Sequence, residues 1–259
     1  MEPPISPLIF SGVLLVGMVV LLEAGRRLGI RRRSGESEAE RSSLGTVEAA
    51  VFALFGLLVA FTFSGGALRF NEKRMLIADE ANAIETAYLR LHLVAQQAQP
   101  ELRELFRQYV DSRLETYRKM PNMKAAEIEM SKSKQVQQQI WTKAVAATAL
   151  PQSHPDAGKL LLPALNSMID ITTTRTMALQ VHPPRIIYDL LFLLGLLCAL
   201  LAGYRMAIGE HRSWLHILSF AVITVIIVYV ILDVEYPRAG LFRIEASDQM
   251  LVQVRENMK

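Results

Sequence analysis

The sequence predicts an all-α membrane protein with four transmembrane helices and a helical-bundle domain inserted between helices two and three. Four apolar segments carry the first part of this prediction, because each approaches the roughly 20 residues that a helix needs to cross a bilayer. They lie near residues 8–25, 49–68, 186–204 and 213–232. The polar stretch between the second and third segments keeps a helical period, without strand-like alternation or a hairpin dipeptide, which favours a bundle.

These segments set the expected boundaries along the chain. The first segment follows Glu2 without a Lys or Arg and is not followed by an A-x-A site, so we interpret it as a membrane helix and not as a cleaved signal peptide. We expect transmembrane helices at 1–25, 46–69, 185–206 and 213–233, an arginine-rich loop at 26–45, a soluble helical bundle at 70–184, a short loop at 207–212 and a C-terminal tail at 234–259 with a short amphipathic helix.

Composition agrees with a membrane protein that has a sizeable soluble part. Of the 259 residues, 51% are hydrophobic and 20% are charged. The net charge of +3 comes largely from the arginine-rich loop, and no basic stripe alternates with aromatics, which argues against nucleic-acid binding. Cys198 is the only cysteine, so the sequence excludes a disulfide within the chain and a thiolate metal cluster.

Arginine placement predicts the topology. Six arginines lie within residues 26–41, and two more lie in the second short loop near residues 205–212. Basic residues accumulate in short cytoplasmic loops, so both loops are expected in the cytoplasm, with the bundle and both termini outside. Basic residues at the opposite membrane edge argue for the reverse orientation; they are Arg69, Lys73, Arg74, Arg185, Arg238 and Arg243.

The second apolar segment is expected to continue into the soluble part as one helix, over residues 45–97. No proline interrupts it, and Gly65-Gly66 is its weakest point. Its polar half carries one apolar stripe, formed by Ile77, Ala81, Ile84, Tyr88, Leu91 and Ala95. Further helices are expected at 100–120, 123–150 and 157–180, and at 247–258 with Met250, Leu251 and Val254 facing inward.

Several motifs resemble the bestrophin-like domain family of bacterial membrane proteins, which is distantly related to bestrophin anion channels. They are EAGRRLGIRRR, LLVAFTFSGGALRFNEKR, EANAIETAYLR, LLLPALNSMID and DVEYPRAGLFRI, in that order along the chain. The resemblance implies a multi-pass protein of the bacterial inner membrane. It also implies a homo-oligomer around a pore lined by the second helix, selective for anions. True bestrophins place their large domain in the cytoplasm, which opposes the arginine-based topology.

The sequence offers no catalytic or metal-binding motif. Walker, G-x-S-x-G, H-E-x-x-H and C-x-x-C patterns are absent. His211 and His216 are five residues apart, which does not place them on one helical face. We therefore predict no enzymatic activity, no cofactor and no metal site.

Two sets of residues on the second helix are candidates for function. Phe52, Phe55, Val59 and Phe63 recur at helical spacing, either as packed or lipid-facing side chains or as an apolar ring that lines a pore. Small residues nearby (Ala60, Ser64, Gly65, Gly66 and Ala67) allow close helix packing. A polar group further along (Asp79, Glu80, Asn82 and Glu85) is either a solvated helix face or a seam where subunits or ions meet.

A third set of candidates lies at one membrane edge. Ionisable groups near hydrocarbon are costly, so Asp189 or Asp233 is expected to pair with Arg69, Arg185 or Arg238 and fasten the helices together. Separate snorkelling of each side chain into the headgroups is the alternative.

The leading functional hypothesis is a homo-oligomeric ion channel, with the lipid bilayer, further copies of the chain and small ions as partners. The alternative is an envelope sensor or scaffold whose helical bundle binds a ligand or partner protein. A receptor needs a signalling module in the cytoplasm, whereas the predicted cytoplasmic side has only two short loops, which favours the channel.

Overall fold

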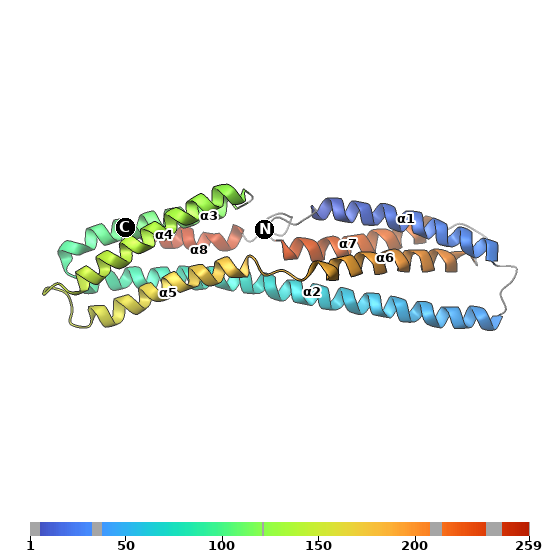
Figure 1. The fold of residues 1–259 in the computed structure, drawn as a ribbon, viewed down its shortest axis with the longest axis horizontal. Coiled ribbons are helices and arrows are strands. Elements are labelled where there is room, and N and C mark those ends of the chain that lie inside the picture. The colour runs from blue at the N-terminus through green and yellow to red at the C-terminus, as the bar shows by residue number, and fades with distance from the viewer. Residues whose placement is uncertain (1–5, 33–37, 121, 208–213, 237–244, 259) are drawn as a thin grey trace. The chain divides into compact units, whose positions relative to one another are not determined.

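A computed structural model describes residues 6–32, 38–120, 122–207, 214–236 and 245–258, which form helices and connecting turns without any strand (Figure 1). The predicted all-α class is confirmed, and α1, α2, α6 and α7 are long and apolar enough to cross a membrane. The elements are α1 (Pro7–Arg32), α2 (Glu38–Leu89), the 3-10 turns η1 (Arg90–Leu93) and η2 (Gln96–Ala98), α3 (Gln99–Arg118), α4 (Met123–Thr148), α5 (Ala157–Ala178), α6 (Arg185–Met206), α7 (Trp214–Glu235) and α8 (Glu245–Asn257).

The chain forms two compact units. The apolar unit comprises the described residues within Pro3–Arg69 and His182–Tyr236, and the polar unit comprises those within Phe70–Val181 and Pro237–Lys259. Helix α2 supplies its apolar part to the first unit and its amphipathic part to the second. Each unit has its own hydrophobic core.

In the apolar unit, α1 packs along α6 and α7 (Figure 1). Its core contains side chains from all three of these helices, among them Leu14, Met18, Leu22, Leu191, Cys198, Ile217, Ala221 and Val228. The side chains in this core are apolar, as lipid chains are, so the contacts between its helices depend mainly on how well their shapes fit together.

The closest approach in this unit is between α1 and α6, at glycines. A Cβ atom added to Gly25 would lie 2.0 Å from the Leu200 carbonyl oxygen, and one added to Gly203 would lie 2.0 Å from the Leu22 carbonyl oxygen. Gly25 and Gly29 form a G-x-x-x-G pattern on α1, in which the missing side chains let two backbones touch. The sequence interpretation looked for such packing on α2 and overlooked this pattern on α1.

The first helix extends beyond its expected end. Helix α1 continues to Arg32, so the arginines at 26–32 lie on its last turns and not in a loop. Arg27 Nε contacts Glu23 Oε1 at 2.9 Å, an i,i+4 pair that supports these turns.

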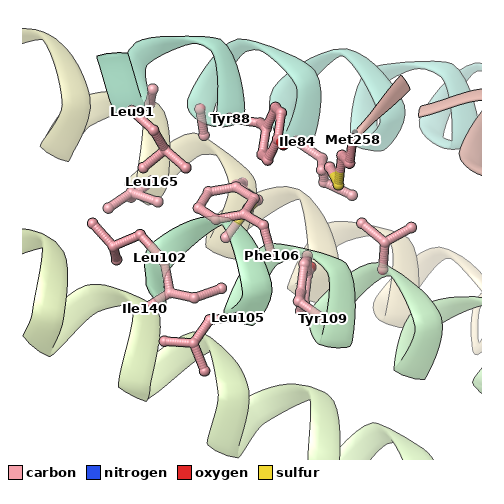
Figure 2. Packing of buried hydrophobic residues seen from close by; sticks show 14 of the residues in the cluster. Ile84, Tyr88, Leu91, Leu102, Leu105, Phe106, Tyr109, Ile140, Leu165 and Met258 are labelled. Atoms are coloured by element: carbon pink, nitrogen blue, oxygen red, sulfur yellow. The ribbon is translucent and has the colours of Figure 1, made fainter. Parts of the chain in front are cut away.

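In the polar unit, the end of α2 packs with α3, α4 and α5. Figure 2 shows the contacts at the centre of its core, which include Ile84, Tyr88, Leu91, Leu102, Phe106, Ile140 and Leu165. All six residues of the predicted stripe are buried, four of them on α2 and two, Leu91 and Ala95, just beyond its end. Periodicity therefore identified the inward face of α2 correctly.

Helix α2 ends at Leu89, earlier than expected. The chain then forms η1 and η2, and Val94 between them is extended. The turn after α4 holds this segment in place: Ala95 N–H donates to Ser153 Oγ at 2.8 Å, and His154 N–H donates to the Leu93 carbonyl at 2.8 Å. These bonds replace the intrahelical bonds that a longer α2 would have made.

The C-terminal helix α8 packs against the core of the polar unit. Leu251, Val254 and Met258 are buried there, whereas Met250, which was expected to face inward, is 39% exposed. Arg255 forms two hydrogen bonds with Asp111 of α3, at 2.7 and 3.0 Å. These contacts set the rotation of α8, which places Met250 on the outside.

Candidate functional site

The four aromatic and aliphatic candidates on α2 do not share one environment. Phe55 is buried against Gly195 of α6, and Phe52 contacts the Phe220 ring edge to face at 5.9 Å. Val59 also packs against the core of the apolar unit. Phe63, by contrast, is 46% exposed. Three of the four therefore face helices of their own chain.

The opposite face of α2 is apolar and has no partner within the described residues. Leu54, Leu57, Phe61 and Leu68 each expose more than half of their surface. They are spaced three, four and seven residues apart, which is the a/d spacing of helices that pack against one another. Only 6% of the most apolar stretch of α2 is buried, compared with 28% for α1 and 39% for α7. We call these four residues the open stripe.

A charged cluster links the end of the apolar part of α2 to α7. Arg69 Nε and Nη2 donate to Glu235 Oε2 at 3.0 and 2.7 Å. His182 Nδ1 lies 3.1 Å from Glu235 Oε1, and the His182 ring stacks on Tyr236 with centroids 4.7 Å apart. Glu235 is almost fully buried, and its charge is balanced by Arg69, which lies at the end of the apolar part of α2.

The other described edge candidates make further contacts. Arg185 Nε is 3.8 Å from Asp189 Oδ1, but both side chains are exposed and both belong to α6. Asp233 is buried and accepts a hydrogen bond from Tyr229 at 3.3 Å. Arg238 lies outside the described residues. The described contacts thus join Arg69 to Glu235, which was not among the candidates.

A second charged cluster lies in the core of the polar unit, around Glu80 of α2. Arg113 Nε of α3 donates to Glu80 Oε1 at 2.6 Å, and Tyr117 OH donates to Oε2 at 3.0 Å. Arg175 of α5 also binds Oε2, and its Nη2 donates to Asp248 of α8 at 3.0 Å. Two carboxylates and two guanidiniums therefore balance their charges where four helices meet.

Neutral polar groups extend this cluster. Tyr109 OH lies 3.1 Å from Thr172 Oγ1, and Gln137 Nε2 donates to both of these oxygens at 3.1 Å. The side chains of Tyr109, Thr172 and Gln137 thus all have a hydrogen-bond partner, as a buried polar network requires.

The surroundings of Glu80 determine its protonation. Burial alone would raise its pKa, but the charges of Arg113 and Arg175 outweigh burial and hold the pKa below its usual value of 4.5. Burial raises the pKa values of Tyr109 and Tyr117, so both remain neutral donors. Glu80 is therefore ionised at neutral pH and links α2 to α3 and α5.

The polar candidates on α2 separate by face. Asp79 and Asn82 are exposed, Glu85 is half-buried, and Glu80 alone is fully buried. Sequence reasoning missed its partners Arg113 and Arg175. A signal for Arg113 was present, because it lies one helical turn from Tyr109 and from Tyr117 on the inward face of α3.

Metal binding gains no support from the geometry. No group of three His, Cys, Asp or Glu residues in the described part of the chain converges as a metal site would require. His211 lies outside that part.

Comparisons with known proteins point to one family. A model of the Bestrophin-like domain matches residues 11–249. A single-site variant of a bacterial Bestrophin homolog from Klebsiella pneumoniae is 14% identical in sequence, with a TM-score of 0.63 over 94% of this chain and 98% of that chain. A second variant of that homolog has a TM-score of 0.62, with the same identity and coverage. At this identity the likeness concerns the fold alone. No curated protein matches the sequence.

Proposed function

The chain belongs to the Bestrophin-like domain family, and on this premise we propose that it assembles as a homo-oligomeric ion channel in a membrane. Helix α2 lines the pore. The open stripe carries this proposal, because Leu54, Leu57, Phe61 and Leu68 form an exposed row, apolar except for Ser64 between its last two members, that no other described residue covers.

The open stripe, and not the set Phe52, Phe55 and Val59, faces the other copies and the pore. Side chains packed inside their own chain are not available to a pore, whereas an exposed row with a/d spacing fits the same row on a neighbouring α2. An apolar row of this kind narrows a pore and controls the entry of water and ions by dewetting. Phe61 and Leu57 are the side chains that form the constriction.

The arrangement in the membrane follows from the same helices. Helices α1, α2, α6 and α7 cross the bilayer of a bacterial inner membrane, and the bundle is inserted between the second and third of them. The arginines near residues 26–41 support an orientation with the short loops in the cytoplasm and the bundle outside. Selectivity for anions rests on the distant relation to bestrophin anion channels.

Assembly can be tested by measuring the mass of the purified protein in detergent or lipid nanodiscs at several concentrations. We expect a defined multiple of the 29.0 kDa chain. A clean monomer under all conditions would contradict both the oligomer and the pore.

A further inference from the structure

The polar unit contains a hollow of about 300 Å³ between α2 and α5. On one side it is lined by Asn82, Ala83 and Thr86 of α2 with Arg90 of η1. On the other side it is lined by Pro163, Ala164 and Ser167 of α5. Its volume is at the lower end of the range for small-molecule sites, about 300–1,000 Å³.

The hollow exists because the facing residues are small. Ala83 and Ala164 place only methyl groups between the two helices, and Pro163 contributes a flat apolar ring and no N–H group. Ser167 Oγ donates to the carbonyl of Pro163 at 3.1 Å, so its hydroxyl is turned back toward its own helix. The floor of the hollow is therefore largely apolar.

Arg90 supplies the charge of this site. Because α2 ends at Leu89, Arg90 lies on η1 and its Nη1 donates to the Leu160 carbonyl at 2.6 Å. This bond anchors the guanidinium beside the hollow and leaves Nη2 and Nε without a hydrogen bond to the described residues. None of the lining residues is acidic, so the positive charge is not balanced within the hollow.

We propose that this hollow binds a small aliphatic monocarboxylate. A guanidinium presents N–H groups in a planar fork that matches a carboxylate, and the Asn82 amide and Thr86 hydroxyl add two further donors. The apolar floor of Ala83, Pro163 and Ala164 accommodates a short hydrocarbon body. A divalent cation does not fit, because the lining has no carboxylate.

A doubly charged phosphate fits less well than a monocarboxylate. Phosphate sites combine several cationic or backbone N–H donors, whereas this hollow has one cation and an apolar floor. The ligand site goes beyond the proposed channel function and does not depend on ion conduction.

Saturation-transfer NMR on the full chain in detergent, with butyrate as the probe, tests this site. Butyrate should bind saturably, and Arg90→Gln should weaken binding at least tenfold. Ser167→Leu should abolish binding, because the larger side chain fills the hollow while Arg90 remains. Arg118→Gln is the matched control, since it removes an exposed arginine that does not line the hollow, and it should bind as the wild type does.

Three results would overturn the assignment. They are the absence of saturable butyrate binding to the wild type, unchanged binding by Arg90→Gln, and displacement of butyrate by phosphate at equal concentration. Thermal melting of each variant establishes that it is folded. Arg90→Lys, which keeps the charge without the planar fork, should retain weaker binding, so loss of the fork is distinguished from loss of the fold.

Discussion

Arg69 at the end of the apolar part of α2 binds Glu235 at the end of α7 through both Nε and Nη2. The two residues are 166 positions apart in sequence, and Glu235 is almost fully buried. A buried carboxylate that loses its cation is costly. This pair therefore fixes how α2 and α7 meet within the apolar unit.

Exchanging the two charges tests this role. Arg69→Glu alone should lower stability by about 1–3 kcal/mol, a buried-pair cost reduced for the partial exposure of Arg69. Adding Glu235→Arg should recover part of the loss, because the pair is restored in reverse. Thermal melting in detergent measures both. If the double variant is as unstable as the sum of its single changes, the two residues do not interact.

The Glu80 cluster predicts a pH dependence. The pKa of Glu80 is lowered in the folded protein, so its contribution to stability is present above the unfolded pKa of about 4.5 and is lost as pH falls through the folded value. Denaturant unfolding between pH 7 and pH 3 should show this loss. Glu80→Gln should be less stable at pH 7 by about 3–5 kcal/mol, because two buried guanidiniums lose their shared carboxylate.

The difference between wild type and Glu80→Gln should shrink as the pH falls below 4.5, since the unfolded wild type then takes up a proton on Glu80 while the folded protein still holds it ionised. Only below the lowered pKa of the folded protein do both proteins carry a neutral group at this position. Other carboxylates titrate in both proteins and cancel in the comparison. A difference that stays constant down to pH 3 would show that the charge of Glu80 is not what stabilises the cluster.

The contact between α1 and α6 depends on glycine. Gly25→Ala should destabilise the protein by about 1–3 kcal/mol, because the new methyl group would overlap the Leu200 carbonyl and push the helices apart. Gly12→Ala is the matched control on the same helix, where no atom lies within 4 Å of the added group. It should be neutral or slightly stabilising. Equal melting temperatures of the two variants would contradict the close contact.

Labelling of a single cysteine measures the topology. Gln152 is exposed in the turn between α4 and α5, whereas the neighbouring Ser153 hydrogen-bonds to the backbone of Ala95 and Ala147 and is a poorer site. With Cys198→Ser, a cysteine introduced by Gln152→Cys should react with a membrane-impermeant maleimide in intact cells. Reaction only after lysis would place the polar unit in the cytoplasm.

The periodicity of apolar residues in the sequence was sufficient to predict most of the helices. The stripe containing Ile77, Ile84 and Leu91 predicted which face of α2 is buried, because polar residues mark its other face. In the apolar part of the same helix both faces are hydrophobic. Pattern alone could not show that Phe55 packs inside and Phe61 stays open, since that depends on how the neighbouring helices pack.

Contacts between residues far apart in the sequence explain the other differences between the predicted and the observed structure. Helix α2 ends at Leu89 because of hydrogen bonds with the turn after α4, including the one that the Ala95 N–H donates to Ser153 Oγ, 58 positions away. The partner of Arg69 depends on the rotation of α7, where Asp233 and Glu235 point about 200° apart. The sequence places both carboxylates at the same edge but does not show which of them faces α2.

The central claim is that α2 lines a pore with its open stripe, and current through planar bilayers measures this most directly. The purified protein should conduct under chloride and potassium gradients. Phe61→Ser should increase the conductance by removing an apolar constriction, whereas Phe55→Leu, inside the core, should leave the conductance unchanged. A protein that is oligomeric and folded yet carries no current, or a conductance that Phe61→Ser does not alter, would contradict the account.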